Sequence, residues 1–154
     1  MEIFKLELIF QQLKTEDLSL EDRSLHKAAI HTALRAYAPY SHFKVGAAVL
    51  LTDGTIVEGN NQENAAYPSG LCAERVALFT AGATFPERPV AAIAIVATRN
   101  GIIQSAIAPC GACRQVMLET EKRYGQPMRI LMCGDETTVI AYSTKDLLPL
   151  AFEL

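Results

Sequence analysis

Three cysteines constrain the fold of this chain more than any other feature. Cys110 and Cys113 lie three residues apart in "PCGAC", and Cys72 lies in "PSGLCAERVAL". Both stretches have the pattern of a helix that begins at or next to its cysteine. Thiols three residues apart at a helix start point to one face, about one turn apart. If one site uses all three thiols, two helices must begin at the same point of the molecule.

The position of these thiols favours metal binding. The free N–H groups and the dipole of a helix N-terminus lower a thiol pKa and so favour thiolate. The Cys110 and Cys113 pair alone also fits a redox pair or two core thiols, but Cys72 adds a third ligand. Three thiolates leave one tetrahedral position of Zn²⁺ open for water, which is typical of a catalytic rather than a closed structural site. The sequence therefore predicts a catalytic zinc site.

Glu74 follows Cys72 by two residues. Its side chain would leave the helix in another direction, where it is better placed as an acid and base than as a ligand. Zinc-dependent nucleobase deaminases carry H-x-E followed by P-C-x-x-C, with Cys in place of His in some and the Glu as a proton carrier. This chain reads C-A-E and then P-C-G-A-C. A lone Glu in a first helical turn would be an ordinary surface residue, but beside three matched cysteines we expect it to carry protons.

Composition limits the range of partners. The 154 residues, enough for one domain, are 50% hydrophobic and 20% charged, with a net charge of -3. The absence of a basic run argues against nucleic acid and membrane surfaces and favours a small, neutral ligand. The first 17 residues are interrupted by charges and lack a basic region and a cleavage site. We therefore expect a cytoplasmic protein with reduced thiols.

Hydrophobic periodicity and turn residues outline an α/β sandwich with a mixed sheet and flanking helices. Strands joined through a helix are expected to pair in parallel. The stretch "EIFKLELIF" is expected to add an edge strand ahead of the main fold. The predicted elements are a helix from 20 to about 37, a hairpin over 43–59 with its turn at Asp53-Gly54, a helix over 71–83, a strand over 90–98 covered on both faces, a helix over 108–124, and strands over 128–134 and 137–143.

From about Ala36 to Phe152 the chain resembles the cytidine deaminases of the small homotetrameric, three-cysteine type. The resemblance is carried by "AYAPYSHFKVGAA", "NQENAAYPSGLCAERVAL", "PCGACRQV" and "LLPLAF". It implies a three-layer α/β/α sandwich with a mixed five-stranded sheet over residues 21–154, with residues 1–20 as an N-terminal extension that holds the extra strand. It also implies one Zn²⁺ per subunit, a homotetramer, and hydrolytic deamination of cytidine and deoxycytidine to uridine and deoxyuridine plus ammonia, in pyrimidine salvage.

The resemblance also implies a role for each matched residue. Cys72, Cys110 and Cys113 would bind zinc, and Glu74 would carry protons from water to the base and to the departing ammonia. An amide and a carboxylate suit ribose hydroxyls, and an aromatic face suits a base. The implied substrate contacts are Asn61 and Glu63 to ribose, Phe43 to the pyrimidine, a backbone group of Ala73 to the base, and Phe152 to a neighbouring subunit's pocket.

Charge in the metal site calls for compensation. Three thiolates give a Zn²⁺ site a net charge of -1, which weakens the pull of the metal on water compared with neutral histidine ligands. Arg75 and Arg114 directly follow the cysteine motifs. We expect their guanidinium groups to donate to thiolate sulfur and withdraw charge.

Other conspicuous residues receive structural interpretations. None of the histidines has a spacing that pairs with the cysteines, so we expect them to be structural or surface residues. The remaining assignments are Cys133 as a core thiol, His26, His31 and His42 outside the site, and Tyr40 and Tyr67 at the pocket or a subunit contact.

Three alternative functions stay open at this point. A related deaminase could act on blasticidin S or on a base in RNA, although the acidic charge and the joint presence of Phe43, Asn61 and Glu63 favour a free nucleoside. A zinc-stabilised binding module would need a fourth protein ligand, and the sequence offers no suitably placed one. A thiol oxidoreductase would form a reversible disulfide between Cys110 and Cys113.

Overall fold

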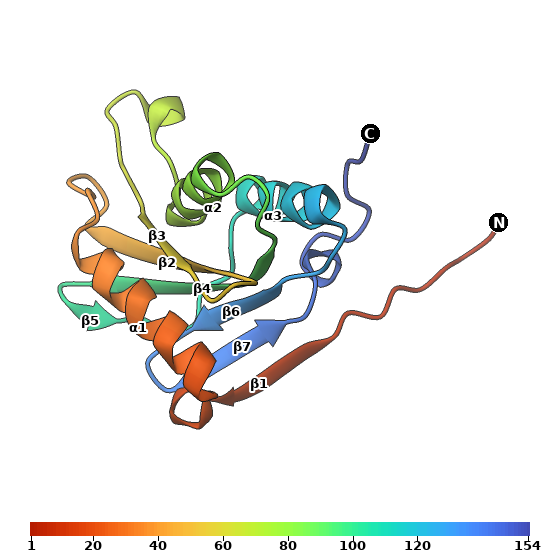
Figure 1. The fold of residues 1–154 in the computed structure, drawn as a ribbon, viewed down its shortest axis with the longest axis horizontal. Coiled ribbons are helices and arrows are strands. Elements are labelled where there is room, and N and C mark those ends of the chain that lie inside the picture. The colour runs from red at the N-terminus through yellow and green to blue at the C-terminus, as the bar shows by residue number, and fades with distance from the viewer.

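One mixed sheet runs through the molecule, with helices on both of its faces (Figure 1). The computed structural model describes residues 1–154. The strand order is β1-β7-β6-β4-β2-β3, and β5 pairs with β4. The strands are β1 (Phe10–Lys14), β2 (Phe43–Leu51), β3 (Ile56–Asn60), β4 (Val90–Arg99), β5 (Ile102–Ile103), β6 (Arg129–Cys133) and β7 (Thr137–Ala141), and the helices are α1 (Leu20–Leu34), α2 (Ala73–Thr84) and α3 (Gly111–Tyr124).

The sheet separates two apolar cores, which confirms the three-layer sandwich. Helix α1 covers one face, and α2 and α3 cover the other (Figure 1). The side chains of β4 alternate between the cores: Ile93 and Ile95 pack on the side of α2 and α3, whereas Ala92 and Ala94 pack on the side of α1. Because β4 is buried on both faces, its run of apolar residues is uninterrupted.

Two glycines allow the helices to lie close to the sheet. A Cβ atom on Gly46 of β2 would lie 2.1 Å from the carbonyl oxygen of Ala29 in α1. A Cβ atom on Gly59 of β3 would lie 2.3 Å from the backbone nitrogen of Ala77 in α2. Only glycine leaves room for these backbone contacts. The second contact places α2 directly against β3, the strand that precedes it.

Strand direction brings the starts of α2 and α3 to the same edge of the sheet. The predicted hairpin of β2 and β3 is antiparallel, and β2 is also antiparallel to β4. Strands β3 and β4 therefore run in the same direction, and α2 and α3 follow their carboxyl ends. The expected parallel pairing is also present, between β4 and β6. Open α/β sheets commonly carry their ligand sites at such an edge.

The sheet has seven strands, one more than the five predicted for the main domain and the predicted N-terminal edge strand together. The five expected strands are β2, β3, β4, β6 and β7, to which the N-terminal strand β1 and the two-residue strand β5 are added. Strand β1 lies over Phe10–Lys14, and the prediction of a strand over residues 2–10 was wrong in its position. The partner strand explains the difference: Phe10 pairs with Ala141, the last residue of β7, so earlier residues have no strand beside them. Helix α1 likewise ends at Leu34, short of the predicted end.

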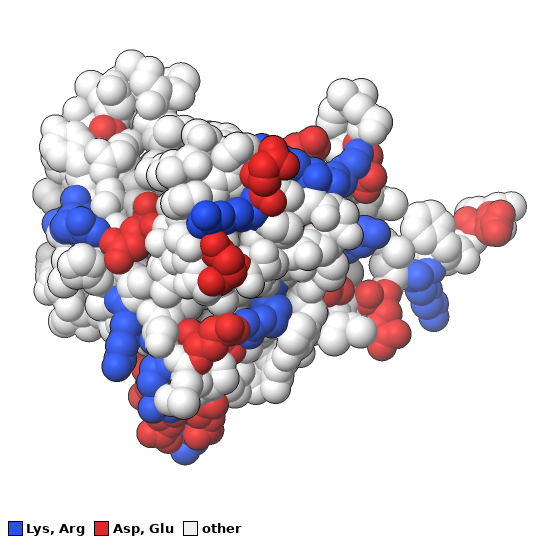
Figure 2. All heavy atoms as spheres, viewed as in Figure 1, with Lys and Arg blue, Asp and Glu red and all other residues white.

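None of the helices combines the length and the apolar character needed to cross a membrane. Acidic and basic side chains are interspersed over the face that Figure 2 shows.

Candidate metal centre and adjoining cleft

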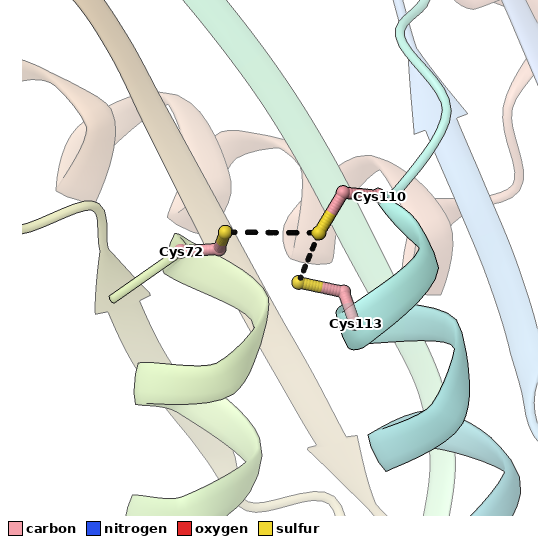
Figure 3. A group of neighbouring side chains, drawn as sticks. All are labelled: Cys72, Cys110 and Cys113. Carbon is pink, nitrogen blue, oxygen red and sulfur yellow. Dashed lines mark hydrogen bonds between the residues drawn. The ribbon is translucent and has the colours of Figure 1, made fainter. Parts of the chain in front are cut away.

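The three predicted thiols meet at the beginnings of α2 and α3 (Figure 3). Cys72 is the N-cap residue of α2, Cys110 is the N-cap residue of α3, and Cys113 lies in the first turn of α3. The Sγ atom of Cys110 is 3.8 Å from that of Cys72 and 3.4 Å from that of Cys113. All three sulfur atoms lie within 4.8 Å of one another. The convergence of two helix starts is thus confirmed.

The spacing of the sulfur atoms suits zinc. Tetrahedral ligands at a Zn–S distance of about 2.3 Å lie about 3.8 Å apart, close to the two separations above. No histidine, carboxylate or further cysteine joins the group of three. A closed structural site would need a fourth protein ligand, so the donor set fits a site with one open position.

The electrostatics of the cluster also call for a cation. A hydrogen bond from Cys113, helped by the Arg75 guanidinium, lowers the pKa of the Cys72 thiol to about 5. The same hydrogen bond and burial raise the pKa of the Cys113 thiol. Sulfur atoms this close cannot all ionise without a positive charge among them. The cluster is therefore prepared to bind a divalent ion as three thiolates.

Glu74 lies in the first turn of α2 and is only 5% exposed. Burial raises the pKa of this carboxyl, and the negative charge of Cys72 raises it further. A buried carboxyl of this kind exchanges a proton more readily near neutral pH than an exposed one does. Glu74 is thus placed beside the thiol cluster without belonging to it.

The two arginines that follow the cysteine motifs make different contacts. The Nη2 atom of Arg75 donates to the Sγ atom of Cys72 at 3.5 Å, as predicted. Arg114 does not form the predicted contact with sulfur: its Nε atom donates to the Pro109 carbonyl at 2.8 Å and its Nη1 atom to the Leu147 carbonyl at 2.6 Å. The guanidinium N–H groups that were predicted to contact a thiolate donate to these two carbonyl oxygens instead. Arg114 instead ties the segment before α3 to the chain that follows β7.

A cleft of about 440 Å³ opens beside Cys72 and Arg75. Its volume falls within the range of small-molecule sites. Its other lining residues include Glu63, which was predicted, and Gln62 and Asn64, which were not. The rings of Tyr40 and Tyr67 also line the cleft and meet edge to face, with their centroids 6.5 Å apart.

Glu63 is held rigidly in this cleft. Its carboxylate accepts hydrogen bonds from the backbone N–H of Tyr40 at 2.9 Å, from that of Ser41 at 3.3 Å, and from the Ser41 hydroxyl. The hydrogen bond from the Ser41 hydroxyl is the main cause that lowers the pKa of Glu63. Ser41 was not predicted as a site residue, since nothing in the local sequence links two residues that lie 22 positions apart.

Asn61 and Phe43 are joined at the start of β2. The Asn61 amide accepts from the Val45 N–H at 2.8 Å and donates to the Phe43 carbonyl at 3.0 Å. The Phe43 ring is half-buried, and the guanidinium of Arg99 lies 5.6 Å from its centroid. In this chain neither residue lines the cleft.

The other two residues predicted to contact the substrate differ in their exposure to solvent. Ala73 is fully buried at the first position of α2, whereas Phe152 is 69% exposed. Its carbonyl accepts a hydrogen bond from Gln115 of α3, and it is not part of the cleft of its own chain.

Cys133 and the three histidines lie outside the thiol cluster, as predicted, although His42 lies near the Glu63 carboxylate. Cys133 is buried in β6, and burial raises the pKa of its thiol to about 12. His26 is buried in α1, where burial lowers its pKa, and His31 contacts Glu58. No histidine belongs to the thiol group.

Comparisons with known proteins agree with this geometry. Residues 19–124 match the family model described as the cytidine and deoxycytidylate deaminase zinc-binding region. A cytidine deaminase of Halalkalibacterium halodurans is 52% identical over 84 residues, which cover 54% of this chain and 60% of that protein. One from Mycobacterium tuberculosis is 41% identical over 106 residues, which cover 67% of this chain and 76% of that protein. The first of these alignments thus spans less than two thirds of the relative.

Solved structures of cytidine deaminases are similar over more of the chain. The structure from Burkholderia pseudomallei has a TM-score of 0.72 and 44% sequence identity, and covers 84% of this chain and 98% of that one. The structure from M. tuberculosis has a TM-score of 0.68 and 35% identity, and covers 88% of this chain and 100% of that one.

Replacement of one thiol tests the metal site. Cys113→Ser should lower zinc affinity by more than roughly a hundredfold, since even partners outside the ligand set cost 10- to 100-fold when removed. Cys133→Ser, a buried thiol outside the cluster, is the matched control and should retain one zinc per chain. Zinc content after dialysis against a weak chelator distinguishes the two variants, and equal loss in both would contradict this assignment.

Proposed function

The chain belongs to the cytidine and deoxycytidylate deaminase family, and from this premise we propose that it hydrolyses cytidine and deoxycytidine to uridine and deoxyuridine plus ammonia. The observation that carries the proposal is the meeting of three thiols and the buried Glu74 beside a nucleoside-sized cleft. The zinc ion, one per subunit, is held by Cys72, Cys110 and Cys113. Residues 21–154 are the unit to which we assign this activity, with residues 1–20 as an extension.

The reaction needs a group that moves protons. Water forms a bond to C4 of the pyrimidine, the C4–N bond breaks, and ammonia leaves. Zinc, when bound, acts as a Lewis acid that brings the pKa of water toward about 7. Glu74 takes one proton from the attacking water and delivers it to N3 of the base. It then takes the second proton from the new hydroxyl at C4 and passes it to the leaving amine, so that the two protons of water end on N3 and on ammonia. Its burial in the first turn of α2 keeps the carboxyl close to the metal ligands and away from bulk water.

Substrate binding is assigned to Glu63, which lines the cleft, and to three residues that do not line it, Asn61, Phe43 and Ala73. Glu63 binds ribose, because the hydrogen bonds from Tyr40 and Ser41 orient its carboxylate and leave about one of its four lone-pair positions free for a hydroxyl. Asn61 also binds ribose and at the same time fixes the start of β2 through its two backbone contacts. Phe43 packs against the pyrimidine, and a backbone group of Ala73 binds the base.

Arg75 balances charge at the metal. Its contact with the Cys72 sulfur withdraws electron density from a thiolate and so preserves the acidity of the zinc ion. Arg114 acts at a distance, because it holds the backbone at Pro109, immediately before a metal ligand.

The assembly that we propose is a homotetramer in the cytoplasm, acting in pyrimidine salvage. Phe152 supports this assembly: it is a large exposed apolar side chain outside the cleft of its own chain. In a tetramer it reaches the pocket of a neighbouring subunit. If the pure protein sediments as a monomer, both the homotetramer and the proposed role of Phe152 are contradicted.

The first experiment is an ultraviolet absorbance assay with zinc-loaded protein. Cytidine and deoxycytidine should lose their absorbance rapidly, while free cytosine and adenosine should not, because the proposed contacts of Glu63 and Asn61 need a ribose and that of Phe43 needs a pyrimidine. Turnover of blasticidin S alone would favour the rival deaminase. Silence on every substrate would favour a zinc-stabilised binding module.

Glu74→Gln should bind zinc normally and lose turnover by roughly 10²- to 10⁴-fold, the usual contribution of a positioned acid and base. Glu119→Gln is the matched control, since Glu119 is exposed on α3. Steady-state kinetics on cytidine, with zinc content measured on the same samples, make the comparison. Turnover retained by Glu74→Gln would mean that another group carries the protons.

Arg75→Ala should retain zinc but lower kcat by about tenfold or shift the pH optimum of kcat, since the Cys72 thiolate loses its donor. The control is Arg123→Ala, an exposed arginine near the end of α3. The kcat profile from pH 5 to 9 is the measurement. A profile that matches the parent protein would exclude charge balance by Arg75.

A further inference from the structure

The segment ahead of β1 exposes apolar side chains that the proposed reaction does not use. Residues 3–9, here called the arm, leave the body as an extended segment that continues β1 (Figure 1). Every residue of the arm is exposed. The fractions for its apolar members are 76% for Ile3, 69% for Phe4, 56% for Leu6, 45% for Leu8 and 62% for Ile9. Apolar side chains in extended backbone next to a sheet edge favour pairing with another strand.

Two hydrogen bonds, one at Ile9 of the arm and one at Thr15 after β1, show which edge of this segment faces β7. The backbone N–H of Ile9 donates to Asp146 Oδ1 at 3.1 Å, and that of Thr15 donates to the Glu136 carbonyl at 2.8 Å. Both odd-numbered residues thus donate toward the β7 side. Because backbone groups alternate along a strand, those of even-numbered residues face outward. Strand β1 pairs only with β7, so its outward edge is unpaired.

The sequence of the arm is complementary to itself when it is reversed. An antiparallel pair of arms centred on Leu6 matches apolar with apolar residues and acidic with basic ones. The opposed pairs are Leu6 with Leu6, Lys5 with Glu7, Phe4 with Leu8, and Ile3 with Ile9. Opposed residues share a face of the ribbon, so each pair makes a direct side-chain contact.

Other registers lose this match. A shift by two residues in either direction opposes Lys5 with Lys5 or Glu7 with Glu7, and like charges directly opposite destabilise a ribbon. A shift by one residue opposes Lys5 and Glu7 to apolar side chains. A centre at Leu6 also makes the even-numbered residues the hydrogen-bonded pairs of the ribbon. These are the residues whose N–H and carbonyl groups face outward from the free edge.

We propose that the arm pairs with the arm of a second copy of this chain, antiparallel and about a two-fold axis at Leu6. The pairing continues from the free edge of β1 and covers the exposed apolar side chains of both copies. In this register residue 2 of one copy lies opposite Phe10 of the other. The two Phe10 residues are then about 26 Å apart at 3.3 Å per residue, so the two bodies lie at opposite ends of the ribbon.

A cysteine at the axis tests the pairing. In Leu6→Cys the two new thiols oppose each other, with Cα atoms about 5.5 Å apart, which a disulfide can span. In the control Phe4→Cys the two new thiols lie about 13 Å apart along the ribbon and cannot be joined. The zinc-loaded parent protein, treated with oxidised glutathione in the same way, reports any background from its own cysteines.

The expected result is a disulfide dimer of Leu6→Cys on a non-reducing gel, with the 6-to-6 linkage identified by mass spectrometry. It should form at least about tenfold faster than any dimer of Phe4→Cys. Equal rates for the two variants, or no dimer of Leu6→Cys, would overturn the proposal and leave the arm to a different partner.

Charge reversal in the Leu6→Cys background checks the register. Lys5→Glu places Glu opposite Glu7 twice and should slow dimer formation roughly tenfold, because two attractive pairs become repulsive. Adding Glu7→Lys restores opposite charges and should restore the rate. The same rate for all three proteins would contradict the register. Since the arm is exposed, circular dichroism should show the same fold for each.

Discussion

The meeting of two helix starts around three sulfur atoms is the constraint on which the rest of the site depends. Cys72 caps α2 and Cys110 caps α3, so the thiols converge only if both helices begin at one edge of the sheet. That edge exists because β3 and β4 are both antiparallel to β2. The close backbone contact at Gly59 then sets how near α2 lies to β3. The topology of the sheet therefore determines where the metal ligands meet.

Charge in this region is concentrated and must be compensated. Three thiols that ionise together and a buried carboxyl would repel one another without a cation. Three sources of positive charge compensate the negative charge: the metal that the ligands suit, the N-terminal ends of two helices, and the Arg75 guanidinium, which contacts Cys72. Arg114 serves the same site through the backbone, because its two carbonyl contacts hold the segment before α3 in place. Two arginines that each directly follow a cysteine motif thus make different contacts.

Chemistry and association occupy different parts of the sheet. The thiols lie at the carboxyl ends of β3 and β4, whereas the arm continues β1, and β1 and β3 are the two edges of the strand order. The proposed arm pairing therefore adds a contact between copies without touching the cleft. The exposed Phe152 lies near α3, in the C-terminal segment whose residues 148–151 line one groove together with Leu6, Glu7 and Leu8 of the arm. Its proposed contact is with the pocket of a neighbouring subunit.

Periodicity and close spacing were enough to predict the helices and the hairpin, the parallel pair joined through a helix, the Cys110 and Cys113 pair, and a carboxyl two residues after Cys72. Cys72 lies 38 positions before Cys110, and its place in the same site was predicted from the deaminase motif rather than from local spacing. The contact of Arg114 with the Leu147 carbonyl, the orientation of Glu63 by Ser41 and the start of β1 at Phe10 became apparent from the folded structure alone. The reason is physical. These outcomes depend on which partner is available across the fold, and a partner 22 or more positions away leaves no trace in local sequence.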